Sequence, residues 1–375
     1  MANIYANAYV VLSATATEEC DDGFLQTRSK PLHLQYTHWG ERELRARQVE
    51  NHNCRRSKRI ETYTLFQRGW CMQERFLARR IIHFLPDEIL FECEFGRECE
   101  CGAAREETIV DPDKKGFQTF TRLRVAPKMT QGFGLDWLEI VQDYSNMNLT
   151  YGGDSLPALS GLAACMEHLK PGTYIAGLWQ HDIAFQLAWC VKPSSSTRRW
   201  KYPEDIDIVG PTFSWSSHVR TIEVYRPLHD EEKICALKSF EVHPATPNPY
   251  GQVLRASLCL SGRMVSGGNL VSWLETLKPG GHTECVHIDT GLEYITSSLS
   301  TYSNEYVRLQ SRIKGTDIKC FGLYSYGSWK GDVVDGLLLK PEGTTEGVYV
   351  RIGVVRELEK SWFYGNAGSC TITIV

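Results

Sequence analysis

The period of the hydrophobic pattern changes near Val219, and this change limits the possible folds of the 375-residue chain more than any other feature. Before it, apolar residues recur at helical spacing, as Trp137, Ile140, Val141 and Tyr144 do. After it, short alternating runs such as VLRASLCLSGRMV and GVYVRIGVV are separated by glycine, proline and asparagine. The sequence therefore predicts an α+β protein, with a helical amino-terminal half packed on a β-rich antiparallel carboxy-terminal half of barrel or sandwich type.

The same change places a boundary between residues 1–218 and residues 219–375. The segment Phe213-Ser-Trp215 lies at this boundary, and no linker rich in glycine, serine and proline separates the two parts. We therefore expect the two regions to pack as one unit.

Local patterns in the first half predict several elements. Trp70, Gln73 and Leu77 recur at helical spacing within residues 67–78, and residues 79–93 form a hairpin that turns at Leu85-Pro86-Asp87. Glu74 and Arg75 enter the core with this helix, so we expect them in a buried salt-bridge network. Asp154 is placed as the N-cap of a later helix, and residues 1–16 are expected to be extended.

Charge and composition exclude several classes of partner. The 41 basic and 45 acidic side chains give a formal charge of -4, so we expect no nucleic-acid partner, and the basic run from Arg42 to Arg59 is interpreted as a solvated face. No stretch approaches the ~20 apolar residues of a membrane-spanning helix, so we expect no membrane partner. Thirteen cysteines in mostly apolar contexts indicate reduced thiols and a cytoplasmic protein.

Known signatures of cofactor and metal chemistry are missing from the sequence. It contains no phosphate-binding glycine motif, no nucleophile elbow and no zinc-protease helix motif. Cys93, Cys99 and Cys101 alternate with glutamates, but their spacing lacks the paired CxxC of a structural zinc site. We therefore expect no metal and no cofactor.

Four segments of the sequence are idiosyncratic in composition, order and spacing. They are QRGWCMQERFLARRIIHFLPDEILFEC (67–93), WLEIVQDYSNMNLTYGGDSLPALSGLA (137–163), YIAGLWQHDIAFQLAW (174–189) and TFSWSS (212–217). Together they resemble the fungal heterokaryon-incompatibility (HET) family. The opening MANIYANAYVVLSATA fits too, but in that family it follows a tyrosine-tryptophan-glycine strand and an aspartate-cysteine block that this sequence lacks. We therefore expect a HET-like chain without the family's amino-terminal part.

The resemblance implies two classes of function. HET proteins act as cell-death effectors in self/non-self recognition, and HET-like chains also occur beside fungal biosynthetic genes, where some are cofactor-independent cyclases. Our leading hypothesis is an enzyme, a pericyclase of the Diels–Alder type that cyclises an apolar terpenoid or polyketide-like precursor without cofactor. The alternative is a signalling protein of the incompatibility system without catalysis of its own.

The candidate site combines large aromatic residues with hydrogen-bond donors that lie close to them in the sequence. A cyclisation of this kind needs a substrate held in its reactive conformer and a donor to the carbonyl where charge develops. The expected catalytic donors are Arg68, Gln73, Tyr144, His181 and His218. Trp70, Trp179 and Trp215 are the expected substrate-binding walls, and we expect these groups to converge on a cavity between the halves.

Overall fold

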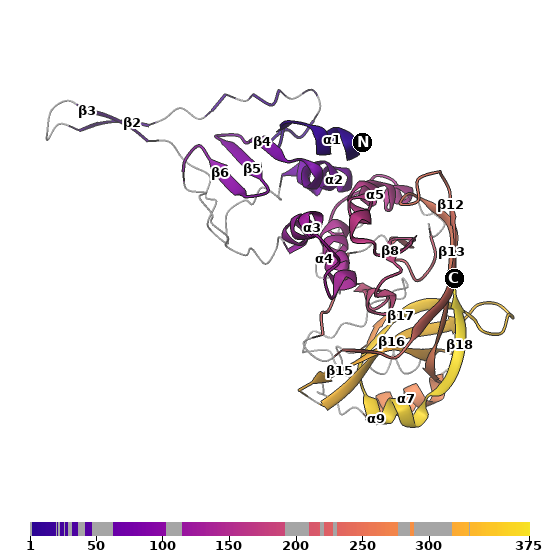
Figure 1. Cartoon of the computed structure of the whole chain (residues 1–375). Coiled ribbons are helices and arrows are strands. Elements are labelled where there is room, and N and C mark those ends of the chain that lie inside the picture. The colour runs from indigo at the N-terminus through magenta and orange to yellow at the C-terminus, as the bar shows by residue number, and fades with distance from the viewer. Residues whose placement is uncertain are drawn as a thin grey trace.

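The computed structural model describes residues 2–19, 21, 23–25, 27–28, 32–36, 42–46, 63–102, 115–191, 210–217, 221–227, 231–276, 286–288, 317–329 and 331–375. Helices and small sheets make up the amino-terminal part, and one large sheet dominates the carboxy-terminal part (Figure 1). Within the described residues, no helix is both long enough and apolar enough to cross a membrane. His218 lies outside the described residues.

The first part of the chain builds a four-stranded sheet with the order β1-β4-β5-β6. Strand β1 pairs parallel to β4, whereas the other neighbours are antiparallel. The predicted hairpin is confirmed, but residues 2–7 form a helix, so the prediction that residues 1–16 are extended is wrong there. The elements are α1 (Ala2–Asn7), β1 (Val11–Ser13), η2 (Thr64–Gln67), α2 (Gly69–Leu77), β4 (Arg80–Phe84), β5 (Ile89–Cys93) and β6 (Gly96–Cys99), with β2 (Leu32–Tyr36) and β3 (Arg42–Ala46) in a separate hairpin.

Helices follow this sheet and enclose the largest hydrophobic core. Helix α4 carries nine buried residues, including Trp137, Ile140, Val141 and Tyr144 from the predicted helical face. The elements are α3 (Lys115–Val125), α4 (Phe133–Ser145), η4 (Gly152–Asp154), η5 (Pro157–Leu159), α5 (Ser160–Ala164), η6 (Glu167–Leu169), β7 (Tyr174–Ile175), β8 (Leu178–Trp179), α6 (Ile183–Gln186), β9 (Cys190–Val191), η7 (Trp215–Ser217) and β10 (Ile222–Glu223).

The carboxy-terminal sheet closes on itself. Strand β15 pairs with β16, β16 with β17, β17 with β18, β18 with β13, and β13 again with β15. These pairings form a five-membered ring, so the barrel rather than the sandwich is observed. The elements are β11 (Glu232–Lys233), β12 (Ala236–Pro244), β13 (Val253–Val265), α7 (Gly267–Thr276), β14 (Val286–Ile288), β15 (Lys319–Ser328), β16 (Gly331–Pro341), β17 (Val348–Glu359), α9 (Lys360–Asn366) and β18 (Gly368–Ile374).

The α+β class is therefore confirmed, although the first half is helical only in its later part. One hydrophobic core contains residues of both halves, such as Trp137 on α4 and Leu258 on β13. The division at residues 218 and 219 stays a prediction.

Arg351 on β17 joins the barrel to the segment after α6. Its side chain is 1% exposed, and its Nη1 donates to the carbonyl oxygen of Leu187 at 2.7 Å. Its Nη2 donates to the carbonyl oxygen of Trp189, and the guanidinium carbon lies 3.5 Å from the centre of the Trp189 ring. A buried guanidinium that is hydrogen-bonded to backbone and stacked on an indole fixes the relative position of both elements.

The turn between β7 and β8 supports two tryptophans from distant segments. Ala176 and Gly177 form a two-residue loop in which both residues have positive φ, at 48° and 98°. This conformation is that of a type I′ hairpin turn. The carbonyl oxygen of Gly177 accepts the indole N–H of Trp137 and that of Trp215, each at 2.9 Å. The turn therefore connects α4 and η7 through one acceptor.

We expect Gly177→Ala to destabilise the fold by about 2 to 4 kcal/mol, because it combines an unfavourable φ with steric overlap. A Cβ at this position would lie 2.7 Å from Nε1 of Trp215. Urea denaturation measures the change. Gly331→Ala is the matched control, since Gly331 has a φ of 109° and no atom of the described residues lies within 4 Å of the added Cβ, and it should lose only about 1 kcal/mol. Equal losses in the two variants would show that the contact with Trp215 is unimportant.

Candidate functional site

Two of the expected catalytic donors are hydrogen-bonded to the main chain. Gln73 is 2% exposed, and its Oε1 accepts the backbone N–H of Gly161 at 2.6 Å. The hydroxyl of Tyr144 donates to the carbonyl oxygen of Ser155 at 2.8 Å. These bonds hold α2 and α4 against the segment that contains η4, η5 and α5. A structural role accounts for both contacts.

Arg68 and His181 lie outside the aromatic core. The Arg68 side chain is exposed just before α2, and its backbone forms an isolated bridge with Asn148. The Nε2 of His181 lies 3.2 Å from a carboxylate oxygen of Asp182, which also pairs with Lys233. Arg68 is therefore exposed, whereas His181 lies beside a carboxylate.

The tryptophans expected as walls differ in their environments. The indole N–H of Trp70 donates to the carboxylate of Asp154 at 3.1 Å, and Trp70 is half-buried. Asp154 is therefore not the predicted helix N-cap: it lies in η4, makes no cap, and binds an indole instead. Trp215 is buried, donates to Gly177, and packs edge-on against Tyr144 with ring centres 5.8 Å apart. The roles assigned to the predicted site residues stay predictions.

Trp179 belongs to an aromatic cluster, which we define as Phe133, Trp137, Tyr174, Trp179 and Tyr250. The rings of Tyr174 and Trp179 lie 4.9 Å apart in an edge-to-face arrangement, and Tyr250 lies 5.4 Å from Tyr174. The backbone of Trp179 is held by Gln186, whose side chain accepts from its N–H and donates to its carbonyl oxygen, both at 2.8 Å. The sequence analysis missed Gln186, although a lone amide in the apolar run IAFQLAW was the available signal.

Two polar atoms of the aromatic cluster have no hydrogen-bond partner among the described residues. They are the indole nitrogen of Trp179 and the hydroxyl of Tyr174, and both are shielded from solvent. Burial raises the pKa of Tyr174, so its hydroxyl remains protonated and can donate. An unsatisfied buried donor costs about 1 to 3 kcal/mol, and the π face of a neighbouring ring is only a weak acceptor. These two atoms are therefore suited to donate hydrogen bonds to a polar group of a bound molecule or to a water.

A buried charged network lies on the small sheet, and we call it the Glu92 network. Arg75 binds both carboxylate oxygens of Glu92 at 3.0 Å, and Arg97 binds one of them at 3.1 Å. The Nε2 of His83 lies 3.2 Å from the same oxygen, and its Nδ1 lies 3.1 Å from the hydroxyl of Thr15. The prediction of a buried network is thus confirmed for Arg75, with Glu92 as its partner.

Strand register explains why these residues meet. Glu92 on β5 is directly paired with Arg97 on β6, and His83 on β4 is directly paired with Leu90, two residues from Glu92. Side chains two residues apart on a strand share a face, so His83 and Glu92 are diagonal neighbours. Helix α2 then supplies Arg75 from above this face.

The Glu92 network contains a hydroxyl, an imidazole and a carboxylate in the order found in hydrolase triads, yet its chemistry is structural. Thr15 and His83 are both 0% exposed, so the hydroxyl is closed to a substrate in this conformation. Burial lowers the pKa of His83 despite the carboxylate beside it, which makes the imidazole a weak base. Burial alone would raise the pKa of Glu92, but Arg75 and Arg97 together hold it well below its usual range.

We expect Glu92→Gln to lower the free energy of unfolding by about 3 to 5 kcal/mol, because it leaves buried guanidinium charge without its carboxylate. The depressed pKa of Glu92 adds a pH dependence with a defined sign. Its stabilising contribution is complete above the unfolded pKa of about 4.3 and is lost as the pH falls through the lower folded pKa. Denaturation curves between neutral and acidic pH measure both effects.

Glu241→Gln is the control for this substitution, since Glu241 is an exposed residue of β12 and should change stability by less than about 0.5 kcal/mol. The acid-induced loss of stability should also be smaller in Glu92→Gln than in the unaltered protein. Identical pH profiles for the two would show that Glu92 is not the group responsible.

Comparison with known proteins supports the family resemblance for one segment of the chain. No curated protein and no solved structure matches the chain significantly. The family model described as Heterokaryon incompatibility protein (HET) matches residues 1–74. This segment includes β1 and Thr15, which follows β1, and it ends within α2, one residue before Arg75. The amino-terminal segment of the chain thus matches the HET family, and the resemblance seen in the sequence is confirmed there.

Proposed function

We propose that this protein acts in fungal heterokaryon incompatibility as a recognition or signalling protein. The observation that carries the proposal is the HET family match over residues 1–74. The described part of this segment packs through the Glu92 network, in which Thr15 contacts His83 and the sheet contacts α2. A rigid scaffold with internally satisfied charges is suited to present a recognition surface.

The environments of the expected catalytic and substrate-binding residues favour recognition over catalysis at those positions. Gln73, Tyr144 and Trp215 each bond to backbone, and Trp70 bonds to Asp154. Tyr144, Trp215 and Trp70 each carry a single donor hydrogen, so that bond must break before the group can donate to a substrate. Arg68 is different, because it is exposed at the start of α2 within the matched segment.

We expect expression of the chain in a fungal strain that carries the incompatible partner allele to reduce colony viability and heterokaryon formation. Arg68→Ala should weaken this response without changing the melting temperature, because the side chain is exposed and contributes charge to the surface. Arg255→Ala, an exposed arginine of β13 outside the matched segment, is the control and should retain the response. Unchanged viability and heterokaryon formation with the unaltered chain would overturn the proposal.

A cofactor-independent cyclase is the second candidate, and it is favoured by the two donors of the aromatic cluster that have no partner among the described residues. The indole of Trp179 and the hydroxyl of Tyr174 are donors in a setting otherwise lined by aromatic rings. Such a setting suits a small apolar terpenoid or polyketide-like substrate with one carbonyl group. A donor to that carbonyl stabilises the charge that develops there during a Diels–Alder cyclisation. Substrate entry requires the cluster to open, since both side chains are buried.

For this candidate, we expect the protein to convert a linear polyene that carries an unsaturated ketone into a cyclic isomer of equal mass. Tyr174→Phe should slow the conversion by about ten- to a thousandfold while the fold is retained, since one donor to developing charge is lost. Chromatography with mass detection measures the rate. Tyr250→Phe is the matched control, because the hydroxyl of Tyr250 is already bonded to Glu167.

The melting temperature of Tyr174→Phe distinguishes a hydroxyl that serves a substrate from one that is only buried in the core. If the hydroxyl is only a buried donor without a partner, its removal stabilises the protein by about 1 kcal/mol and leaves the conversion rate unchanged. No cyclisation by the unaltered protein would exclude the cyclase and leave the incompatibility proposal untouched.

A further inference from the structure

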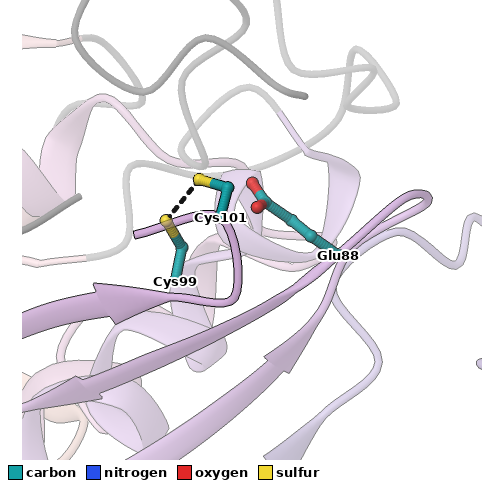
Figure 2. Close-up of side chains that lie close together, drawn as sticks. All are labelled: Glu88, Cys99 and Cys101. Carbon is teal, nitrogen blue, oxygen red and sulfur yellow. Dashed lines mark hydrogen bonds between the residues drawn. The ribbon is translucent and has the colours of Figure 1, made fainter. Parts of the chain in front are cut away.

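Two cysteine thiols meet in the turn that follows β6. Residues 99–102 form a β-turn in which the N–H of Gly102 donates to the carbonyl oxygen of Cys99 at 3.0 Å. Gly102 has a φ of 72°, a conformation that glycine adopts without strain. The turn places the sulfur atoms of Cys99 and Cys101 2.7 Å apart, with both residues as thiols. Figure 2 shows the carboxylate of Glu88 beside this pair.

The register of the sheet brings Glu88 to the two thiols. Strand β5 pairs with β6 so that Leu90 lies opposite Cys99, and the N–H of Glu100 still bonds to Ile89 at 3.1 Å. The same register, continued by one further pair, places Glu88 opposite Cys101. Because alternate residues share a face, Glu88 and both thiols lie on the same side of the ladder.

We propose that Glu88, Cys99 and Cys101 bind one divalent thiophilic cation, with Zn²⁺ as the ion that matches these donors. Their ligand atoms all lie within 4.8 Å of one another. Tetrahedral Zn²⁺, with Zn–S of about 2.3 Å and Zn–O of about 2.1 Å, separates its ligand atoms by about 3.4 to 3.8 Å. Side-chain rotation that moves the sulfurs apart by about 1 Å therefore produces the required geometry.

Binding of the ion releases two protons from this site. Each thiol releases its proton to solvent when the ion binds, so two thiolates and one carboxylate surround the dication. Three ligands from the described residues leave one position of a tetrahedral ion for water or another ligand. Glu88 is 1% exposed, and Cys99 packs against the small core of Phe66, Leu85 and Leu90, so the ion is partly screened from bulk solvent.

A disulfide between Cys99 and Cys101 is the competing chemistry. It requires an external oxidant and uses only the two sulfurs. A cation uses all three groups, which is why the structure favours metal binding. Spacing in the sequence could not reveal this site, because the third ligand comes from the turn before β5.

The test uses the full chain, purified without a histidine tag. We expect elemental analysis to find about one zinc per chain, and Co²⁺ added after chelation to give a thiolate-to-cobalt charge-transfer band. Cys99→Ser, Cys101→Ser and Glu88→Gln should each weaken Co²⁺ binding by more than about a hundredfold. The loss of a residue that only hydrogen-bonds to a metal ligand costs about ten- to a hundredfold in affinity, and loss of a ligand itself should cost more.

Cys93→Ser is the matched control. Cys93 lies on the same hairpin, is similarly half-buried, and pairs with Gly96 at the opposite end of the ladder. It should bind Co²⁺ as the unaltered chain does, and circular dichroism establishes that each variant is folded. A chain without zinc and without the cobalt band overturns the proposal. So does an intact mass two hydrogens lower that reverts on reduction, because it identifies a disulfide.

Discussion

The carbonyl oxygen of Gly177 is the acceptor on which the packing of the amino-terminal half depends. It receives the indole N–H groups of Trp137 and Trp215, which lie in segments nearly eighty residues apart. Both indoles are buried, so an N–H without an acceptor inside the protein would cost free energy. The tight turn with positive φ exposes one carbonyl to both, so the two large rings pack together with their N–H groups paired.

The barrel is attached to this region by a second buried donor. Arg351 reaches from β17 to the carbonyl oxygens of Leu187 and Trp189 and stacks on the Trp189 indole. Trp189 itself donates to the carbonyl oxygen of Phe213 at 3.0 Å. The segment that precedes the barrel is therefore held by aromatic side chains and backbone acceptors together, and the hydrophobic core continues across both halves.

Polar groups in this protein divide into those that the fold satisfies and those that it leaves available. The Glu92 network belongs to the first kind, since its carboxylate meets two guanidinium groups and an imidazole. Such a network stabilises a unique arrangement of α2 on the sheet and is unsuited to proton transfer. Among the described residues, the donors of Tyr174 and Trp179 belong to the second kind.

The sequence by itself determined the α+β class, the hairpin of β4 and β5, the helical face of α4 and the resemblance to the HET family. Each follows from local periodicity, turn residues or residue order. Only the tertiary structure decided that Gln73 and Tyr144 bond to backbone, that Asp154 binds the Trp70 indole, and that Glu88 faces Cys101. The physical reason is that hydrogen-bond partners and strand register depend on groups distant in the sequence, which local patterns do not specify.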